Sequence, residues 1–309
     1  MIAAIKKPKV IVICGPTGIG KTWVGIRLAE KLGGEIISAD SMQIYRYMDI
    51  GTAKPTADEQ SRIFHHMIDI ADPDEDFDTV RFAEMAREKV MQLHQRGVIP
   101  VVVGGTGLYI KALLQGLFQS HPVDPQIRER LMQEAAENQG GFLYDRLKQI
   151  DPDTADRLHP NDAYRIIRAL ETIEATGRSI SEHHQDHGFA DEPFNALKIG
   201  LQMDRQKLYN RIDQRVDLML AAGFFDEVKK LLGMGYPADL KSMQSIGYRH
   251  IIEVIEGSLS RDEAVRTLKR DTRRFAKRQF TWFGADQQVR WYEPDHGNEI
   301  VRLAEGFLE

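Results

Sequence analysis

The sequence has very little cysteine and no long hydrophobic run. Cys14 is the only cysteine among 309 residues, which excludes an internal disulfide and suits a reducing cytosol. No apolar run approaches the roughly 18 residues of a membrane-spanning helix, and the N-terminal residues lack the apolar segment and cleavage site of a secretion signal. We therefore expect a cytoplasmic protein that does not enter a membrane.

The chain also lacks an excess of positive charge. Its 41 Lys and Arg residues are outnumbered by 46 Asp and Glu residues, so the net charge is −5 and does not by itself indicate a nucleic-acid-binding protein. The hydrophobic content of 42% is ordinary for a globular protein, and the length allows a large domain and a smaller second one. Where the charges lie is therefore more informative than their sum.

The first motif joins a hydrophobic segment to a glycine-rich loop. Residues 9–14 are typical of a buried parallel strand, and residues 23–32 have a helical pattern. Between them, Gly15-Pro-Thr-Gly-Ile-Gly-Lys-Thr22 matches G-x-x-x-x-G-K-T, in which backbone N–H groups and Lys21 bind phosphate and the Thr22 hydroxyl holds Mg²⁺. These features predict an α/β fold with a P-loop-type parallel sheet flanked by helices, and a diphosphate or triphosphate ligand.

An NTPase usually has a second part beside the P-loop. This part is an acidic residue at the end of another strand, where it orders the water shell of Mg²⁺. The best candidate for that strand, residues 98–103, runs into Gly104-Gly-Thr-Gly107 and contains no acid there. Asp69 could end a different strand and is kept as a candidate metal partner. The pattern favours diphosphate binding over ATP hydrolysis.

Two polar residues are expected at the same edge of the sheet as the P-loop. A strand predicted over residues 35–39 leads to Asp40, and ligands of such sheets lie beyond the carboxyl ends of the strands. Asp40 is a candidate general base, with helix capping or support of the P-loop as the alternative. Thr106 offers a hydroxyl to a ligand, or caps the helix predicted over residues 108–114, or does both.

The middle of the chain is predicted to form a small inserted helical domain, residues 122–196, between two parts of the core, residues 1–121 and 197–309. Residues 197–203 have the pattern of a strand that rejoins the sheet. His183, His184 and His187 lie in a polar stretch without a clear fourth ligand, so we expect a loop there and no metal site. The predicted helices cover residues 124–138, 141–149, 154–158 and 162–176.

Near the C-terminus, basic residues recur at helical spacing, which places them on one face of a helix. Such a stripe is typical of a phosphate-binding surface, with a solvated charged face as the alternative. Only Asp262, Glu263 and Asp271 lie nearby in the sequence to neutralise it, so we predict contact with phosphates. The basic residues are Arg266, Lys269, Arg270, Arg273, Arg274, Lys277 and Arg278.

A series of ordered motifs resembles the bacterial tRNA dimethylallyltransferases, also called tRNA isopentenyltransferases. The resemblance runs from Lys9 to about Trp291, with Gly18-Ile19 standing where the family commonly has Ala-Ser, so that one side-chain hydroxyl is lost. After the P-loop, the motifs are Ser38-Ala-Asp-Ser-Met-Gln-Ile-Tyr45, Asp49-Ile-Gly-Thr-Ala-Lys-Pro55, His65-His-Met-Ile-Asp69, Val103-Gly-Gly-Thr-Gly-Leu-Tyr109, Asp162-Ala-Tyr-Arg-Ile-Ile-Arg-Ala-Leu-Glu171, Ser245-Ile-Gly-Tyr-Arg249 and Lys277-Arg-Gln-Phe-Thr-Trp282.

The resemblance implies transfer of a dimethylallyl group from dimethylallyl diphosphate to the exocyclic amine of the adenine on the 3′ side of the anticodon, with release of diphosphate. It implies that Asp40 accepts a hydrogen bond or proton from that amine, that Thr106 lies at the reaction centre, and that Arg215, or else Arg211, reaches the diphosphate. Mg²⁺ would be the cofactor, with Thr22 as a ligand, and we expect a monomer. The diphosphate-binding residues would be Gly15, Pro16, Thr17, Gly18, Ile19, Gly20, Lys21 and Thr22.

The same resemblance implies several segments that contact the tRNA anticodon stem-loop. They come from the first half, the middle and the C-terminal part of the chain. The residues are Asp40, Ser41, Met42, Gln43, Thr106, Arg128, Tyr164, Arg165, Ile166, Ile167, Arg168, Gln244, Ser245, Ile246, Gly247, Tyr248, Arg249, Lys277, Arg278, Gln279, Phe280, Thr281, Trp282, Phe283 and Gly284.

Two other functions fit parts of the pattern. A prenyltransferase acting on free adenine nucleotides would use the same P-loop, but would need neither the inserted domain nor the basic helix. A P-loop kinase or NTPase would also use the loop and Asp40, but the segment after Val103 lacks the expected acid.

Overall fold

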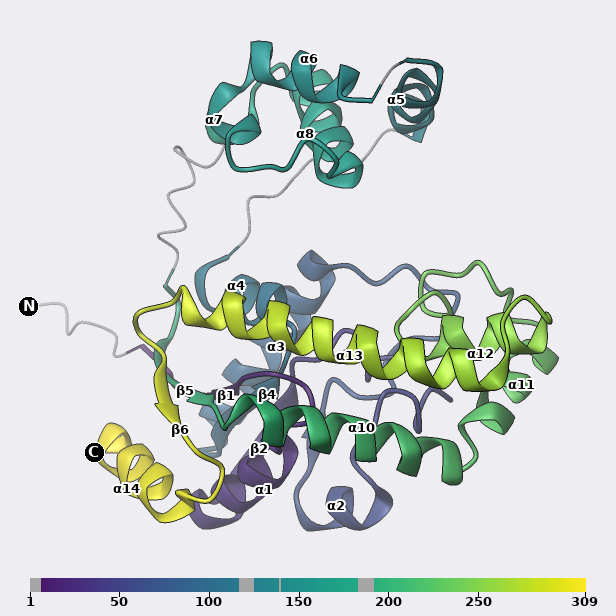
Figure 1. Cartoon of the computed structure of the whole chain (residues 1–309). Helices are drawn as coiled ribbons and strands as arrows, with labels where there is room; N and C mark the ends of the chain where they lie inside the picture. Colours follow the sequence, from purple (N-terminus) through teal and green to yellow (C-terminus); the bar gives the residue numbers. More distant parts are fainter. Residues whose placement is uncertain (1–6, 117–124, 139, 183–191) are drawn as a thin grey trace, which may run out of the picture. The chain divides into compact units, whose positions relative to one another are not determined.

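The computed structural model describes residues 7–116, 125–138, 140–182 and 192–309. The chain divides into two compact units, and unit 2, Gln115–Glu192, interrupts the sequence of unit 1, Met1–Leu114 and Pro193–Glu309 (Figure 1). Unit 2 overlaps the inserted domain predicted at residues 122–196. The three histidines of the polar stretch, His183, His184 and His187, lie outside the described residues.

Unit 1 is built on a six-stranded sheet in which every pairing is parallel, in the order β3-β2-β4-β1-β5-β6. The predicted α/β fold with a parallel sheet is therefore confirmed. The strands are β1 (Lys9–Cys14), β2 (Gly34–Ser38), β3 (His65–His66), β4 (Ile99–Gly104), β5 (Asn195–Leu201) and β6 (Arg290–Tyr292).

The central strand β1 is buried on both faces, which explains its uninterrupted run of hydrophobic residues. Because side chains alternate along a strand, Val10 and Val12 belong to one hydrophobic cluster, whereas Ile11 and Ile13 belong to the other. All four residues are completely buried. The sheet thus separates two cores, each covered by helices.

One core lies between the sheet and helices α1 and α14, which pack against each other. The other lies between the sheet and α3, α4, α11, α12 and the end of α13. Helix α10 contributes Leu208 and Ile212 to the first core and Val216 to the second. The helices of unit 1 are α1 (Lys21–Leu32), α2 (Ala57–Arg62), α3 (Thr79–Gln95), α4 (Gly107–Gln115), α10 (Arg205–Ala221), α11 (Phe224–Gly233), α12 (Tyr248–Ile255), α13 (Arg261–Gly284) and α14 (Gly297–Leu308).

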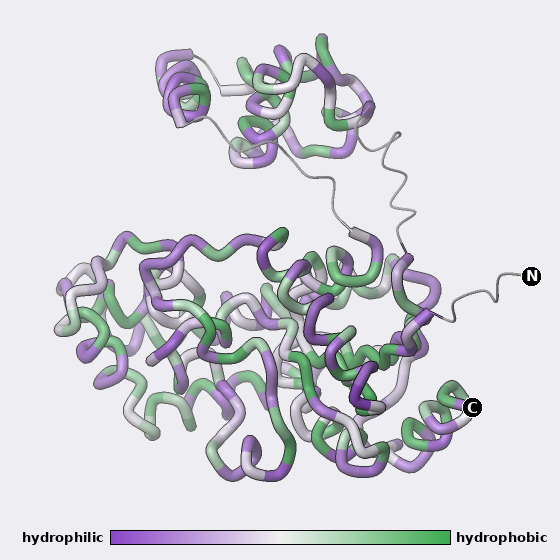
Figure 2. Tube along the Cα trace, turned by 180° about the vertical axis from the view of Figure 1, so that it is seen from behind, coloured by the Kyte–Doolittle hydropathy of each residue, from purple (hydrophilic) through white to green (hydrophobic). Residues whose placement is uncertain are grey.

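Several helices of unit 1 begin or end at a typical capping residue. Asp78 accepts a hydrogen bond from the Arg81 N–H group at the start of α3, and Ser260 accepts one from Glu263 at the start of α13. Gly33 ends α1 in the left-handed region. Along α14, beside the C label in Figure 2, hydrophobic and hydrophilic residues alternate, as expected of a helix with one face packed on α1.

Unit 2 is entirely helical in its described part, with α5 (Pro125–Glu137), α6 (Phe142–Ile150), α7 (Pro152–Ala155) and α8 (Ala163–Thr176). Its own small core includes Leu131, Leu147 and Leu170. Asp162 caps the start of α8 through the Arg165 N–H group, and Gly177 ends it. The predicted helix over residues 162–176 is confirmed to within one residue.

Helix α13, the long helix of unit 1 in Figure 1, packs against α10 and α12. None of the helices in the described part of the chain is long and apolar enough to cross a membrane.

Candidate active site

The glycine-rich loop connects β1 to α1, as its sequence predicts. Gly18 and Gly20 have φ angles of 79° and 105°, and α1 begins directly afterwards at Lys21. Gly15, with φ of 139°, packs so closely on β5 that an added Cβ would lie 2.8 Å from the Leu201 carbonyl oxygen. A side chain at Gly15 would therefore force the loop away from the end of β5.

A small cavity of about 90 Å³ lies against this loop, at the carboxyl ends of β2 and β4. Lys21 and Thr22 line it from the loop, Asp40 from the segment after β2, and Arg215 from α10. Two cations thus face a single carboxylate, beside a helix N-terminus whose dipole adds positive potential. The structure brings together the P-loop, Asp40 and Arg215, which the sequence predicted to share a site.

The two cations of this cavity are half-buried, and the surrounding protein desolvates their charges. Burial lowers the pKa of Lys21 to about 8, although the nearby Asp40 opposes the shift; its ammonium donates a hydrogen bond to the Pro16 carbonyl at 2.8 Å. Burial also lowers the pKa of Arg215, with Asp40 opposing and Arg211 adding to the effect. Within the described part of the chain, neither Arg211 nor Arg215 forms an ion pair. A bound anion would compensate both the desolvation and the charge.

A larger cavity of about 1290 Å³ adjoins the small one and shares Gly18, Gly20, Thr22 and Arg215 with it. Its wall combines Arg211 with apolar side chains from α1 and α10. The apolar lining residues on or next to these helices are Trp23, Leu218, Met219 and Ala222, and the loop after β2 adds others such as Ile50. The two cavities together offer an anion site next to a largely apolar space.

Hydrogen bonds hold Asp40 and Thr106 in place at the sheet edge. Asp40 accepts a hydrogen bond from the Met42 N–H group at 2.9 Å through Oδ1. Thr106 Oγ1 accepts one from the Ser41 N–H group at 3.0 Å, and the Thr106 N–H group donates to the Ala39 carbonyl at 3.1 Å. The Thr106 side chain therefore connects the start of α4 to the Asp40 segment.

Gln43 is engaged at both ends of its amide. It accepts a hydrogen bond from the Ser38 hydroxyl at 3.0 Å, and its Nε2 donates to the Ala53 carbonyl at 3.2 Å. Its role in the structure is to hold the loop of residues 49–55 next to the cavity. Contact with an RNA base would require it to exchange these bonds.

Asp69 does not end a strand, because β3 covers only His65–His66. The expectation of a strand-terminal acid at this position is wrong. The Asp69 carboxylate instead pairs with the buried ammonium of Lys54 at 2.6 Å, and Asp49 pairs with the same ammonium at 2.5 Å. This triad braces the loop that lines the larger cavity.

Glu227 on α11 supports the same loop and was not predicted. Its carboxylate accepts hydrogen bonds from the N–H groups of Asp49, Ile50 and Gly51 at 2.7–3.0 Å. It also accepts a hydrogen bond from the Tyr248 hydroxyl at 2.6 Å. A lone acid in the first turn of a helix carries no sequence signal for such a role.

The basic stripe on α13 is largely neutralised, because acids of α10 lie beside it in addition to the three acids that are near it in the sequence; its contact with phosphates stays a prediction. Lys269 pairs with Asp217 at 2.7 Å and Arg273 with Asp213 at 2.6 Å, both acids belonging to α10. Arg266 pairs with Glu263, and both Arg270 and Arg274 lie within 4 Å of Asp271. Among the described residues, Lys277 and Arg278 are exposed and have no acidic partner.

The C-terminal residues assigned to tRNA differ widely in accessibility. Lys277, Arg278 and Thr281 are exposed, and Trp282 is 46% exposed. Gln279, Phe283 and Tyr248 are buried, and Arg249 pairs with Asp271 at 2.9 Å. The exposed set, with Gly284, forms the accessible surface at the end of α13.

The residues of unit 2 that were assigned to tRNA also include both exposed and buried side chains. Tyr164 is 68% exposed at the start of α8, and the Arg128 guanidinium lies over its ring at 5.3 Å. Ile166 and Ile167 belong to the core of the unit and are buried. Arg168 and Arg128 both pair with the buried Glu171 at 3.3 Å.

Cys14, the last residue of β1, is free and buried directly before the glycine loop. Burial raises the pKa of its thiol to about 12, more than Lys21 lowers it. The thiol is therefore protonated at neutral pH and unsuited to act as a nucleophile.

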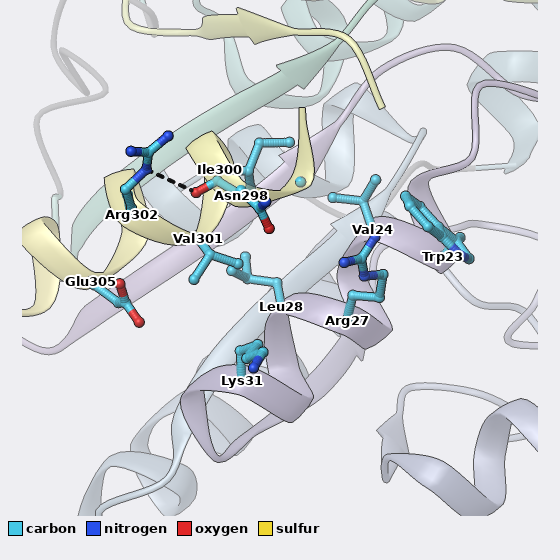
Figure 3. A pocket seen from close by; sticks show the side chains of 11 residues that line it. Trp23, Val24, Arg27, Leu28, Lys31, Asn298, Ile300, Val301, Arg302 and Glu305 are labelled. Carbon is cyan, nitrogen blue, oxygen red and sulfur yellow. Dashed lines mark hydrogen bonds between the residues drawn. The ribbon is translucent and has the colours of Figure 1, made fainter. Parts of the chain in front are cut away.

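A third cavity, of about 440 Å³, lies on the outer face of α1 against α14 (Figure 3). Val24 and Leu28 face Ile300 and Val301, and Arg27, Lys31 and Arg302 stand around them. It contains none of the residues predicted for the active site.

The fold and the site together define a P-loop protein with an anion pocket at the carboxyl edge of a parallel sheet. The IPP transferase family model matches residues 43–286, so the chain belongs to the IPP transferase family.

Similar proteins support this assignment over nearly the whole chain. The chain is 58% identical over 295 residues to a tRNA dimethylallyltransferase of Desulfosudis oleivorans, covering 96% of this chain and 94% of that protein. It is 52% identical over 308 residues to tRNA dimethylallyltransferase 2 of Syntrophus aciditrophicus, covering 100% and 99%.

Two solved structures have the same fold. The full-length tRNA isopentenylpyrophosphate transferase of Bacillus halodurans superposes with a TM-score of 0.74 and 41% identity, covering 98% of this chain and 97% of that one. A eukaryotic dimethylallyltransferase acting on tRNA has the same TM-score at 31% identity, covering 89% and 69%.

Proposed function

We propose that the protein transfers the dimethylallyl group of dimethylallyl diphosphate to the exocyclic amine of the adenine on the 3′ side of the anticodon in tRNA. One observation carries this proposal. Lys21 and Arg215, both with pKa values lowered by burial, enclose a glycine-lined cavity together with Asp40. The cavity thus combines an anion site with a base, as group transfer from a diphosphate requires.

The diphosphate lies along the glycine loop, with its charge facing Lys21, Arg215 and the N-terminus of α1. Arg211, whose guanidinium lies 3.5 Å from a Cβ placed on Gly20, extends this positive wall. The dimethylallyl chain occupies the apolar part of the larger cavity, beside Trp23 and Leu218. Both parts of the substrate then meet groups of matching polarity.

In the reaction, the bond between the allylic carbon and the diphosphate oxygen breaks with both electrons leaving on the diphosphate. The adenine amine forms the new carbon–nitrogen bond, and Asp40 accepts the proton that the amine loses. Positive charge from Lys21 and Arg215 stabilises the growing charge on the leaving group. Thr106 accepts a hydrogen bond from the Ser41 N–H group and so fixes the segment that carries Asp40.

Mg²⁺ fits this arrangement through the Thr22 hydroxyl. No group of three or more His, Cys, Asp or Glu residues able to hold a metal occurs in the part of the chain that the structure describes. Mg²⁺ commonly keeps several waters and binds through substrate phosphates and one or two protein oxygens, and the Thr22 hydroxyl beside the proposed diphosphate site is such an oxygen. Bound there, the ion would neutralise diphosphate charge.

The tRNA anticodon stem-loop is the proposed second substrate of a monomeric enzyme. At the end of α13, Lys277 and Arg278 supply exposed positive charge and Trp282 supplies an exposed ring. Tyr164 in unit 2 supplies another. Basic side chains bind phosphates, and aromatic rings stack on unpaired bases, which are the features of a single-stranded RNA loop.

Replacing Lys277 and Arg278 together by Gln is expected to weaken binding of the anticodon stem-loop and to lower its salt dependence. Two lost phosphate contacts should reduce the slope of log K against log salt by roughly one to two. The matched control is Lys269→Gln with Arg273→Gln, since both of those cations already have carboxylate partners. Equal slopes for the two double variants would contradict the assignment to Lys277 and Arg278.

The function is tested with labelled dimethylallyl diphosphate, Mg²⁺ and an anticodon stem-loop that has three consecutive adenines. Label on the adenine next to the anticodon is the expected result. Label on added AMP instead would indicate a prenyltransferase of free nucleotides. Cleavage of ATP without any transfer would indicate an NTPase.

A further inference from the structure

One buried side chain connects the two loops of the active site. Gln279 of α13 is only 6% exposed. Its Oε1 accepts a hydrogen bond from the Thr17 N–H group at 2.8 Å, and its Nε2 donates to the Gly105 carbonyl at 2.8 Å. The amide thus spans the space between the glycine loop and the turn after β4.

The two loops carry different parts of the proposed chemistry. Thr17 belongs to the diphosphate loop, four residues before Lys21. Gly105 directly precedes Thr106, whose hydroxyl accepts the hydrogen bond from Ser41 next to Asp40. A continuous series of bonds therefore runs from the diphosphate loop through Gln279 to the segment of the proposed base.

The groups around Gln279 allow only one orientation of its side-chain amide. A Cβ on Gly105 would lie 2.3 Å from Gln279 Nε2 and 3.4 Å from Lys21 Nζ, so the amide is in close contact with the turn. One amide end must accept and the other must donate, because Thr17 offers an N–H group and Gly105 a carbonyl. A rotated amide would place like groups against each other at both ends.

We propose that Gln279 is a positioning residue that does not contact tRNA. It sets the distance between the diphosphate loop and the turn after β4 that contains Gly105 and Thr106. The roles of the two loops rest on the proposed function, whereas the two hydrogen bonds do not. Its neighbours Lys277 and Arg278 are exposed, whereas Gln279 is buried and both ends of its amide bind the two loops.

The test compares Gln279→Met, which keeps the length but removes both hydrogen bonds, with the unaltered protein. Because displacements of about 1 Å at a reacting centre cost on the order of 100-fold in rate, we expect kcat to fall by roughly 100-fold. The KM for the stem-loop should change little. Binding of inorganic pyrophosphate with Mg²⁺, measured without RNA, should weaken by roughly tenfold, as a displaced loop loses charge-assisted bonds.

Two further variants separate positioning from stability. Asp78→Ala removes the cap of α3, a helix that carries none of the residues assigned to the site, and should lower the melting temperature while leaving kcat unchanged. Gln279→Asn keeps the amide but shortens its reach, so it should lose as much kcat as Gln279→Met. If either Gln279 variant is too unstable to measure, the other decides the outcome.

Unchanged kcat and pyrophosphate binding in the folded Gln279 variants would overturn the proposal. So would a raised KM for RNA with normal kcat, since that result would make Gln279 a tRNA contact. A parent protein that binds pyrophosphate in a Gln279-dependent way but never prenylates RNA would overturn the proposed function alone.

Discussion

Asp40→Asn is expected to slow prenyl transfer by roughly 100- to 10,000-fold, the range of a lost general base. Asparagine keeps an oxygen for the Met42 N–H group, which Asp40 now binds at 2.9 Å, so the segment should keep its conformation. It cannot accept the proton that the adenine amine must lose. Single-turnover rates with enzyme in excess over RNA would measure this step directly.

The pyrophosphate affinity of the Asp40→Asn variant shows whether the diphosphate site is intact. Asp40 is the carboxylate that faces Lys21 and Arg215, so its neutralisation should leave pyrophosphate affinity unchanged or slightly increased. Asp239→Asn is the matched control, because Asp239 is exposed and lines neither of the two cavities. A near-normal single-turnover rate for Asp40→Asn would remove Asp40 from the role of base.

Lys21→Met is expected to lower kcat/KM by roughly 100- to 1,000-fold, comparable to the loss of one strong group that stabilises transition-state charge. Methionine keeps the unbranched side chain but removes the ammonium, which in the structure is desolvated beside Asp40 and Arg215. The deficit should appear both in pyrophosphate affinity and in the rate of transfer. Normal affinity in this variant would place the diphosphate elsewhere.

The same residue predicts the pH dependence of ligand binding. Lys21 has a pKa lowered to about 8 in the free protein, and only its protonated form attracts the diphosphate. The Lys21 contribution is therefore fully present well below pH 8 and is lost as the pH rises through 8. Since pyrophosphate itself also titrates, the ratio of affinities of the parent protein and Lys21→Met should be followed, and it should fall toward one at high pH.

Local patterns were sufficient to predict the elements that carry the diphosphate site. The strand at residues 9–14, the glycine loop and the following helix are set by neighbouring residues, and the parallel sheet places Asp40 beside them. The cap at Asp162 and the terminating Gly177 likewise define α8 locally. Such features need only residues a few positions apart.

The contacts that hold the site together were not predictable in this way. Thr17 and Gln279 are 262 residues apart, and Glu227 binds N–H groups some 176 to 178 residues before it. The neutralisation of the basic stripe on α13 was not predicted for the same reason, because the acids Asp213 and Asp217 lie on another helix. Helical spacing shows which residues share a face, but not what that face packs against.

The position of Gln279 in the chain also has a consequence for biosynthesis. The ribosome makes the diphosphate loop before unit 2, whereas β5, on which Gly15 packs, follows unit 2, and Gln279 emerges later still. Domains commonly begin to fold during synthesis, at about 5–20 residues per second. A nascent chain therefore carries an unfinished diphosphate loop until β5 and then Gln279 have emerged, so competence for catalysis follows the synthesis of both parts of unit 1.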